Sequence, residues 1–147
     1  MTQENKELLL RDLCARLPYG VKCQIDTGDA DVYADTLATI TIDGCVCFME
    51  TIDTEDALEY DNIKPYLFPL SSMTEEQKYD FYCRFIENDF DFDDFKEFYF
   101  ENNEWHKMLT SIDDIGEIID WFNKNHFDYR GLIEKGLAID ATGLNIY

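Results

Sequence analysis

The sequence predicts an α+β fold in which a short antiparallel β-meander is covered by an N-terminal helix and by C-terminal helices. Three observations carry this prediction: leucines at helical spacing over 8–17, apolar and polar alternation over 21–26, and an Asp-Gly dipeptide at 43–44 between two extended stretches. The 147 residues, 46% of them hydrophobic, suffice for one core, and no repeat or linker divides the chain. We therefore expect a single domain over 1–147.

The first helix is expected close to the N-terminus. Thr2 or Asn5 can cap its start, because both side chains accept hydrogen bonds from backbone N–H groups. Pro18 and Gly20 are expected to end it. Its apolar positions are Leu8, Leu9, Leu13 and Leu17.

The meander begins directly after this helix. Val21, Cys23 and Ile25 alternate with polar residues, and a second extended segment runs over 32–42. A two-residue type I′ turn at Asp43–Gly44 pairs Ile42 with Cys45 and Ile40 with Cys47. This register predicts one apolar face, made of Ala38, Ile40, Ile42, Cys45, Cys47 and Met49.

The segment bracketed by Pro65 and Pro69 is expected to be irregular. A second helix is predicted from Thr74, which forms a capping box with Gln77, to about Glu87. Its inner side is expected to carry Tyr79, Tyr82, Phe85 and Ile86.

The sequence of the C-terminal third predicts a longer helix, then a shorter helix, and then an edge strand. Ser111, Asp113 and Asp114 can start the longer helix. Asp128 can cap the shorter one, which Gly136 ends, and the tail 137–147 can add an edge strand. The apolar side of the longer helix is Ile112, Ile115, Ile118, Ile119 and Phe122.

The charge of the chain indicates its partners. With 32 acidic and 12 basic residues the formal net charge is −20, and no basic residue lies between Lys22 and Lys64. Such a field repels nucleic acid and anionic membranes, and attracts basic protein surfaces over a Debye length of roughly 8 to 10 Å. We therefore expect a basic protein surface as partner, with no direct nucleic-acid binding and no membrane binding.

The N-terminus and the cysteines predict a cytoplasmic protein. The first residues lack the features of a signal peptide, and no stretch of about 18 apolar residues is present. The five cysteines contain no CxxC pair, which favours free thiols without a disulfide.

Several local motifs fail as catalytic or metal sites. Asp26-Thr27-Gly28 matches the aspartic-protease tripeptide, but those proteases are all-β proteins, and an ordinary turn explains it. Asp89, Asp91 and Asp93 have EF-hand spacing, yet the positions that need Gly and Glu hold Asp94 and Phe100. Weak attraction of divalent cations stays open.

Neither Gly131–Gly136 nor the two histidines adds a site. The glycines lack the Lys and Ser or Thr of a phosphate loop, and His106 and His126 have no neighbour at metal-ligand spacing. We predict no catalytic residue, no cofactor and no metal.

The acidic aromatic block over 79–105 is the predicted partner-binding region, because aromatic side chains anchor interfaces and charge steers the approach. Its conformation stays open: an extended chain places Phe90 and Phe92 on one face, whereas a helix buries Phe95 and Phe98 first. The candidate binding residues are Asp89, Asp91, Asp93, Asp94, Phe90 and Phe92.

Three stretches carry a resemblance: LLLRDLCARLPYG over 8–20, IKPYLFPLSSMTEE over 63–76 and IDWFNKNHFDYRGLIEKGLAI over 119–139. Together they resemble a family of short, uncharacterised gut-bacterial proteins that are often carried on prophages or other mobile elements. The resemblance implies a genomic context, and it carries no activity, cofactor or functional residue.

The sequence thus favours a small acidic interaction protein without enzymatic activity. One form is a phage or mobile-element inhibitor whose carboxylates imitate the phosphates of DNA on a basic protein surface. Two alternatives stay open: the charge only keeps the domain soluble, or the chain is a small enzyme or a regulator that responds to divalent metal.

Overall fold

The computed structural model describes residues 1–26, 28, 32–41, 46–49, 62–86, 90–102, 107 and 115–147. Within these residues a five-stranded sheet and several helices are built, and the predicted α+β fold is confirmed. The elements are α1 (Gln3–Arg16), the 3₁₀ turn η1 (Leu17–Tyr19), β1 (Lys22–Asp26), β2 (Val32–Ile40), β3 (Val46–Phe48), β4 (Ile63–Leu67), the 3₁₀ turn η3 (Leu70–Ser72), α2 (Glu75–Phe85), α3 (Phe92–Lys96), the π-helical turn η4 (Glu97–Glu101), α5 (Ile115–Lys124) and β5 (Ile139–Asp140).

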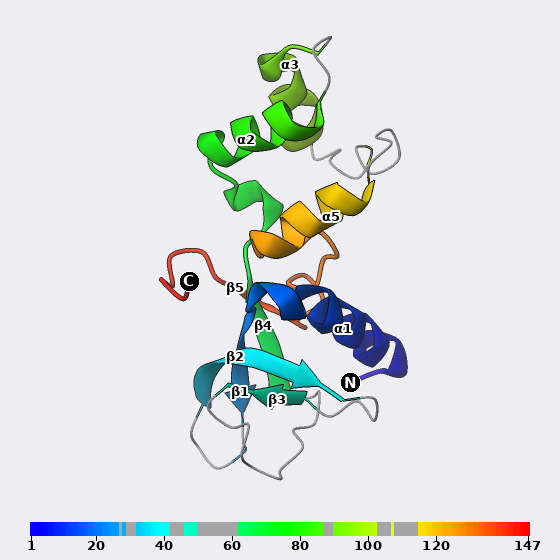
Figure 1. Cartoon of the computed structure of the whole chain (residues 1–147), viewed down its shortest axis with the longest axis vertical. Helices are drawn as coiled ribbons and strands as arrows, with labels where there is room; N and C mark the ends of the chain where they lie inside the picture. The colour runs from blue at the N-terminus through cyan, green and yellow to red at the C-terminus, as the bar shows by residue number, and fades with distance from the viewer. Residues whose placement is uncertain are drawn as a thin grey trace.

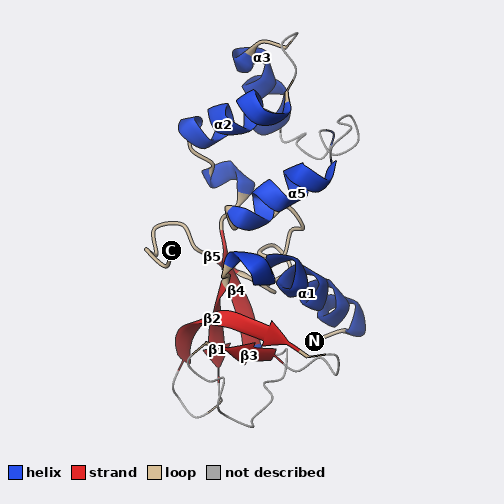
Figure 2. Ribbon diagram, in the orientation of Figure 1, coloured by secondary structure: helices blue, strands red, loops and turns tan. Residues whose placement is uncertain are grey.

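The sheet has the order β3-β2-β1-β4-β5. All neighbouring strands are antiparallel except β4 and β5, which run parallel. Figure 1 shows the sheet and α1 at one end of an elongated molecule and α2 with α3 at the other, while α5 lies between them. Figure 2 shows the same division as a strand-rich end and a helical end. We call the part from η3 through the loop after α5, up to Tyr129, the helical half, and the part with α1 and the sheet the sheet half.

The expected first helix and first strand are confirmed. Thr2 caps α1, because its side-chain oxygen accepts a hydrogen bond of 3.2 Å from the backbone N–H of Asn5. Gly20 ends the following turn with φ of 65°, a left-handed conformation that favours glycine. The core of the sheet half includes Leu9, Leu13, Val21, Cys23 and Ile25, all fully buried.

The predicted pairing of the meander is wrong by one residue. Ile40 pairs with Val46 instead of Cys47, and Cys47 pairs with Thr39. A one-residue slip exchanges the two faces of a strand, so Val46 is buried, Cys47 is half-buried and Met49 is 61% exposed. The predicted turn Asp43–Gly44 and its neighbours Ile42 and Cys45 lie outside the described residues.

The slip has a physical reason. The β2–β3 ladder also shifts its register between Leu37 and Thr39, but the pair Ile40–Val46, which is nearer the turn, is already displaced by one residue, so the reason lies in burial. With the observed register Leu37, Val46 and Phe48 turn inward, and they bury more apolar area than Ala38, Cys47 and Met49 could.

The segment expected to be irregular contains strand β4. Ile63, Pro65 and Leu67 face the core, and Pro65 lies opposite Cys23 of β1. Pairing with β5 starts only at Tyr66, so the missing N–H of Pro65 costs no hydrogen bond on that side. The two prolines indicated an irregular segment, but pairing with β1 on one side and with β5 on the other stabilises a strand there.

The helical half has its own apolar core, made mostly of aromatic rings. Helix α2 begins with the predicted capping box, since Thr74 and Gln77 exchange hydrogen bonds of 2.9 and 3.2 Å. Its expected inner side is partly wrong: Phe81 is the fully buried residue, and Tyr79 is 55% exposed. The buried members are Leu70, Met73, Phe81, Phe95, Ile118, Trp121, Phe122, Phe127 and Tyr129.

In the C-terminal part the predicted longer helix and edge strand are present as α5 and β5, but the shorter helix predicted between them is not formed. Asp128 accepts hydrogen bonds from the N–H groups of Leu132 (2.9 Å) and Ile133 (2.8 Å), yet the chain there forms turns instead of a helix. Gly136 adopts a left-handed φ of 69° and leads into the edge strand β5. Residues 111–114, the expected helix start, lie outside the described part.

A buried ion pair joins the two halves. Arg16 and Asp12 of α1 are both fully buried, and their Nε–Oδ2 distance is 2.7 Å. Arg16 also donates a hydrogen bond of 2.8 Å to the carbonyl oxygen of Phe127 in the helical half. Arg130 adds a longer contact of 3.4 Å to Asp12. The guanidinium of Arg16 thus fixes the loop after α5 against α1.

His126 lies beside this pair in a left-handed conformation with φ of 58°. Its ring stacks on Tyr147 with a centroid distance of 3.9 Å. Burial and the positive charge of Arg16 lower the pKa of His126 to about 4. The imidazole is therefore neutral at neutral pH.

We expect Arg16→Met to lower the free energy of unfolding by about 3 to 5 kcal/mol, because it leaves a buried carboxylate without its main partner. The double variant Asp12→Leu, Arg16→Met should recover part of this loss, since no buried charge then stays unpaired. Urea denaturation measures both. Arg84→Met, which breaks the exposed i,i+4 pair with Asp80, is the control and should cost less than about 1 kcal/mol. Equal losses at Arg16 and Arg84 would contradict the assignment.

The pH dependence of stability should contain a contribution from His126. Between its unfolded pKa of about 6.5 and its folded pKa of about 4, the unfolded chain binds more protons, so stability falls as pH falls. From pH 7 to pH 5 the loss is up to about 2 kcal/mol. His126→Asn, which tolerates the left-handed backbone, should flatten the curve in this range. Parallel curves for both proteins would refute the buried neutral histidine.

Candidate functional site

The acidic aromatic block begins within α2, and its residues 92–101 form α3 and η4. Asp91 caps α3, because its Oδ1 accepts a hydrogen bond of 2.8 Å from the N–H of Asp93. Lys96 ties α3 to α2 through Glu75 at 2.9 Å and also lies 3.2 Å from Asp93. Hydrogen bonds from Lys96 and Lys78 lower the pKa of Glu75. This small network sets the position of α3.

The rings that face α2 are packed, and this orients the opposite side of α3 toward solvent. Phe95 is fully buried and its ring contacts Phe81, with a centroid distance of 6.2 Å. Phe92 is half-buried between Tyr79 and the ammonium group of Lys96. The hydroxyl of Tyr82 donates a hydrogen bond to the carbonyl oxygen of Phe90 and holds the entry to α3.

The predicted binding residues are separated by this geometry. Phe90 is 38% exposed, whereas Phe92 packs on α2, so the extended arrangement with both rings on one face does not occur. Asp91, Asp93 and Asp94 are exposed. Asp89 lies outside the described residues.

A hollow of about 300 Å³ opens on the exposed side of α3 and η4. It is lined by two predicted residues, Phe90 and Asp94, and by three that sequence reasoning did not select, Glu97, Phe98 and Asn102. The helical alternative placed Phe98 in the core, but Phe98 is 39% exposed.

The π-helical turn explains the exposure of Phe98. The N–H of Asn102 bonds to the carbonyl oxygen of Glu97 across five residues, which widens the turn. Tyr99 and Phe100 then pack against the core of the helical half in place of Phe98. The signal in the sequence was the i,i+4 spacing of Asp94 and Phe98, which lie on one side once the segment is helical, whereas Phe90 precedes the helix.

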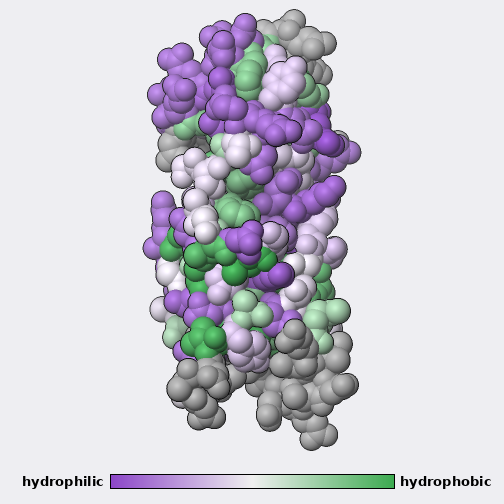
Figure 3. Space-filling model, turned by 90° about the vertical axis from the view of Figure 1, so that its left-hand side faces the viewer, coloured by the Kyte–Doolittle hydropathy of each residue, from purple (hydrophilic) through white to green (hydrophobic). Residues whose placement is uncertain are grey.

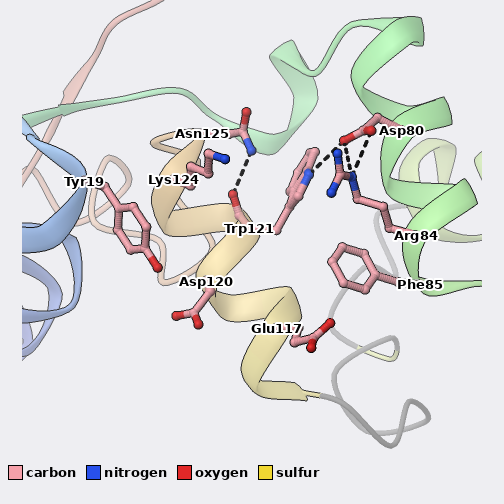
Figure 4. A pocket seen from close by; sticks show the side chains of 9 residues that line it. All are labelled: Tyr19, Asp80, Arg84, Phe85, Glu117, Asp120, Trp121, Lys124 and Asn125. Atoms are coloured by element: carbon pink, nitrogen blue, oxygen red, sulfur yellow. Dashed lines mark hydrogen bonds and ion pairs between the residues drawn. The ribbon is translucent and has the colours of Figure 1, made fainter.

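A second and larger groove of about 530 Å³ lies between η1, α2 and α5. On one side of it Asp80 accepts hydrogen bonds from Arg84 and from the indole N–H of Trp121 (3.1 Å), as Figure 4 shows. These bonds lower the pKa of Asp80, while partial burial and the Asp120 carboxylate raise that of Tyr19. The lining is Tyr19, Asp80, Arg84, Phe85, Glu117, Asp120, Trp121, Lys124 and Asn125.

This groove contains both charge signs, and its most buried carboxylate is already paired. It can hold a polar segment of another molecule, but its mixed charges favour neither a cationic nor an anionic ligand. The hollow beside α3 differs, because its ionisable lining groups, Asp94 and Glu97, are both carboxylates.

The motifs considered for catalysis have structural roles where they are described. Asp26 accepts a hydrogen bond of 2.9 Å from the N–H of Gly28, whose φ is 79°, so the carboxylate of Asp26 bonds to the backbone of its own motif. Across the described ranges, no group of three or more His, Cys, Asp or Glu side chains could hold a metal ion.

No helix in the described part of the chain is long and apolar enough to cross a membrane. Comparisons with protein-family models, curated proteins and solved structures give no match. The functional argument therefore rests on the geometry of this chain.

Thiol reactivity should follow burial. Cys14 and Cys83 are exposed and should react readily with a thiol reagent in the native protein, whereas Cys23 is buried and its pKa is raised by burial. Titration with and without denaturant measures the difference, and the unfolded protein should give five thiols with the metal-free mass. A lower count in fresh protein, or the added mass of zinc, would contradict the cytosolic interpretation.

Proposed function

We propose that this chain is a non-enzymatic interaction protein that binds a basic surface of another protein through the acidic face of its helical half. We define the acidic face by the described residues Phe90, Asp91, Asp93, Asp94, Glu97 and Phe98. The observation that carries the proposal is that exposed Phe90 and Phe98 lie beside Asp94 and Glu97 around one hollow.

Aromatic residues on an acidic face are typical of binding surfaces. An exposed ring leaves apolar area in water, and covering it with a partner is favourable by roughly 25 cal/mol per Å². Interfaces are enriched in such rings, which act as anchors inside a polar rim. In Figure 3 the end of the molecule that carries α2 and α3 is largely hydrophilic, with apolar residues between.

The charge supports a basic partner. A net charge of −20 destabilises the compact state by self-repulsion, and a cationic surface relieves it while it speeds association. Surfaces that bind DNA phosphates are one such class, since carboxylates on successive helical turns can stand in for phosphates.

The alternative of a small enzyme or divalent-metal regulator has no comparable support. In the described residues the larger groove pairs Asp80 with Arg84 and Trp121, and no metal-binding group is formed. We therefore propose a single function.

The substitutions Asp89, Asp91, Asp93 and Asp94 to Asn test this proposal with octalysine as the probe. We expect binding to weaken about tenfold at low salt, because four carboxylates that attract the probe are removed. Thermal stability should stay unchanged or rise, since repulsion is lowered and Asn still caps α3. Isothermal titration at low and moderate salt, together with thermal denaturation, measures both effects.

A charge-matched control removes four exposed carboxylates far from the acidic face: Glu4→Gln, Glu7→Gln, Glu134→Gln and Asp140→Asn. This control should bind octalysine nearly as well as the wild type. An equal loss of octalysine affinity in both variants would show that the probe responds to the total charge of the protein and to no particular site. The alternative in which the charge only keeps the domain soluble predicts this result. A partner purified from the native host should likewise elute at moderate salt and be lost with the acidic-face variant.

A further inference from the structure

We propose that the hollow between Phe90 and Phe98 receives one arginine side chain of the basic partner. This inference rests on the proposed function and adds to it the chemistry of the central contact. It follows from the rings, the carboxylates and the size of the hollow, taken in turn.

The two rings form a corner in which a planar cation can lie. Their centroids are 6.5 Å apart and their planes meet at 75°. The face of a phenyl ring attracts a cation placed within about 6 Å of its centroid. A guanidinium can stack on one ring of such a corner while its edge meets the other.

Rings of this block already attract the cations of the chain itself. Lys96 lies 4.8 Å from the centroid of Phe92, Lys78 lies 5.5 Å from that of Phe100, and Lys107 lies 5.7 Å from that of Phe98. Among the described residues no lysine or arginine lies over Phe90, and Lys107 does not line the hollow. The hollow therefore offers the same kind of contact to a cation from outside.

Two carboxylates complete the site. Asp94 and Glu97 are exposed, one helical turn apart, and within the described residues neither forms an ion pair. A guanidinium carries five N–H donors in a planar fork, so it can reach both carboxylates while its face covers a ring. The amide of Asn102 adds one more hydrogen-bonding group at the rim.

The geometry favours arginine over lysine. An ammonium group is a strongly hydrated point charge, whereas a guanidinium is planar, weakly hydrated and stacks on aromatic faces. At about 300 Å³ the hollow is at the lower end of the range for ligand sites, which suits one side chain better than a larger molecule.

The test uses the tripeptide acetyl-Gly-Arg-Gly-amide, followed through the ring signals of phenylalanine in NMR titrations. The tripeptides with citrulline and with lysine in place of arginine are the controls, because citrulline keeps the shape without the charge. We expect saturable shifts of Phe90 and Phe98 with arginine, binding weaker by about fivefold with lysine, and no saturation with citrulline.

Variants assign the contact. Phe98→Leu keeps an apolar side chain but removes the aromatic face, and it should weaken the arginine peptide by about fivefold. Asp94→Asn with Glu97→Gln should weaken it by about tenfold. The matched pair Glu76→Gln with Glu101→Gln removes the same charge from exposed positions of the helical half that do not line the hollow, and should change binding less than twofold.

Several results would overturn the inference. Equal binding of citrulline would exclude a charged occupant, equal binding of lysine would exclude the preference for arginine, and an unchanged affinity in Phe98→Leu would exclude the ring. If these occur while octalysine binding still depends on the acidic face, the proposed function holds and this inference fails. If octalysine binding is also indifferent to the acidic face, both fail.

Discussion

The architecture depends on the buried guanidinium of Arg16. A charge without water must be compensated, and Arg16 obtains its compensation from both halves: the carboxylate of Asp12 on its own helix and the carbonyl oxygen of Phe127 beyond α5. This requirement fixes the distance between α1 and the loop that follows α5. That loop also pairs with Phe68 next to β4, so the side chain of Arg16 and this backbone pairing together position the helical half.

The helical half reconciles a high density of carboxylates with a folded core. Its rings Phe81, Phe95 and Phe122 pack together, and the acidic residues of α3 and η4 stay at the surface. Lys78 and Lys96 lie over the ring faces of Phe100 and Phe92, and both also form ion pairs with Glu75. A surface rich in negative charge can therefore be held in a defined conformation.

The predictions that succeeded depended on a few neighbouring residues. The capping box of Thr74 and the alternation of Val21, Cys23 and Ile25 are local, and local hydrogen bonds and burial decide them. The predictions that failed depended on distant partners: β4 is a strand because it pairs with β1 on one side and β5 on the other, and the meander register follows the burial of Leu37, Val46 and Phe48. Three of the five residues that line the acidic hollow were likewise not predicted, and one of them, Phe98, is exposed through a π-helical turn that the composition of the segment does not indicate.

The parallel pairing of β4 with β5 has a consequence for the order of folding. Tyr66 lies next to Ile139, so the whole helical half is one crossover between two adjacent strands. Closing a connection of this length costs entropy that the short β4–β5 ladder alone cannot offset. The edge strand can therefore dock only after the aromatic core of the helical half has condensed and brought its own ends together. Since Arg16 also needs that condensed half, the sheet and the helices gain their last contacts in the same step, and the chain should fold as one cooperative unit.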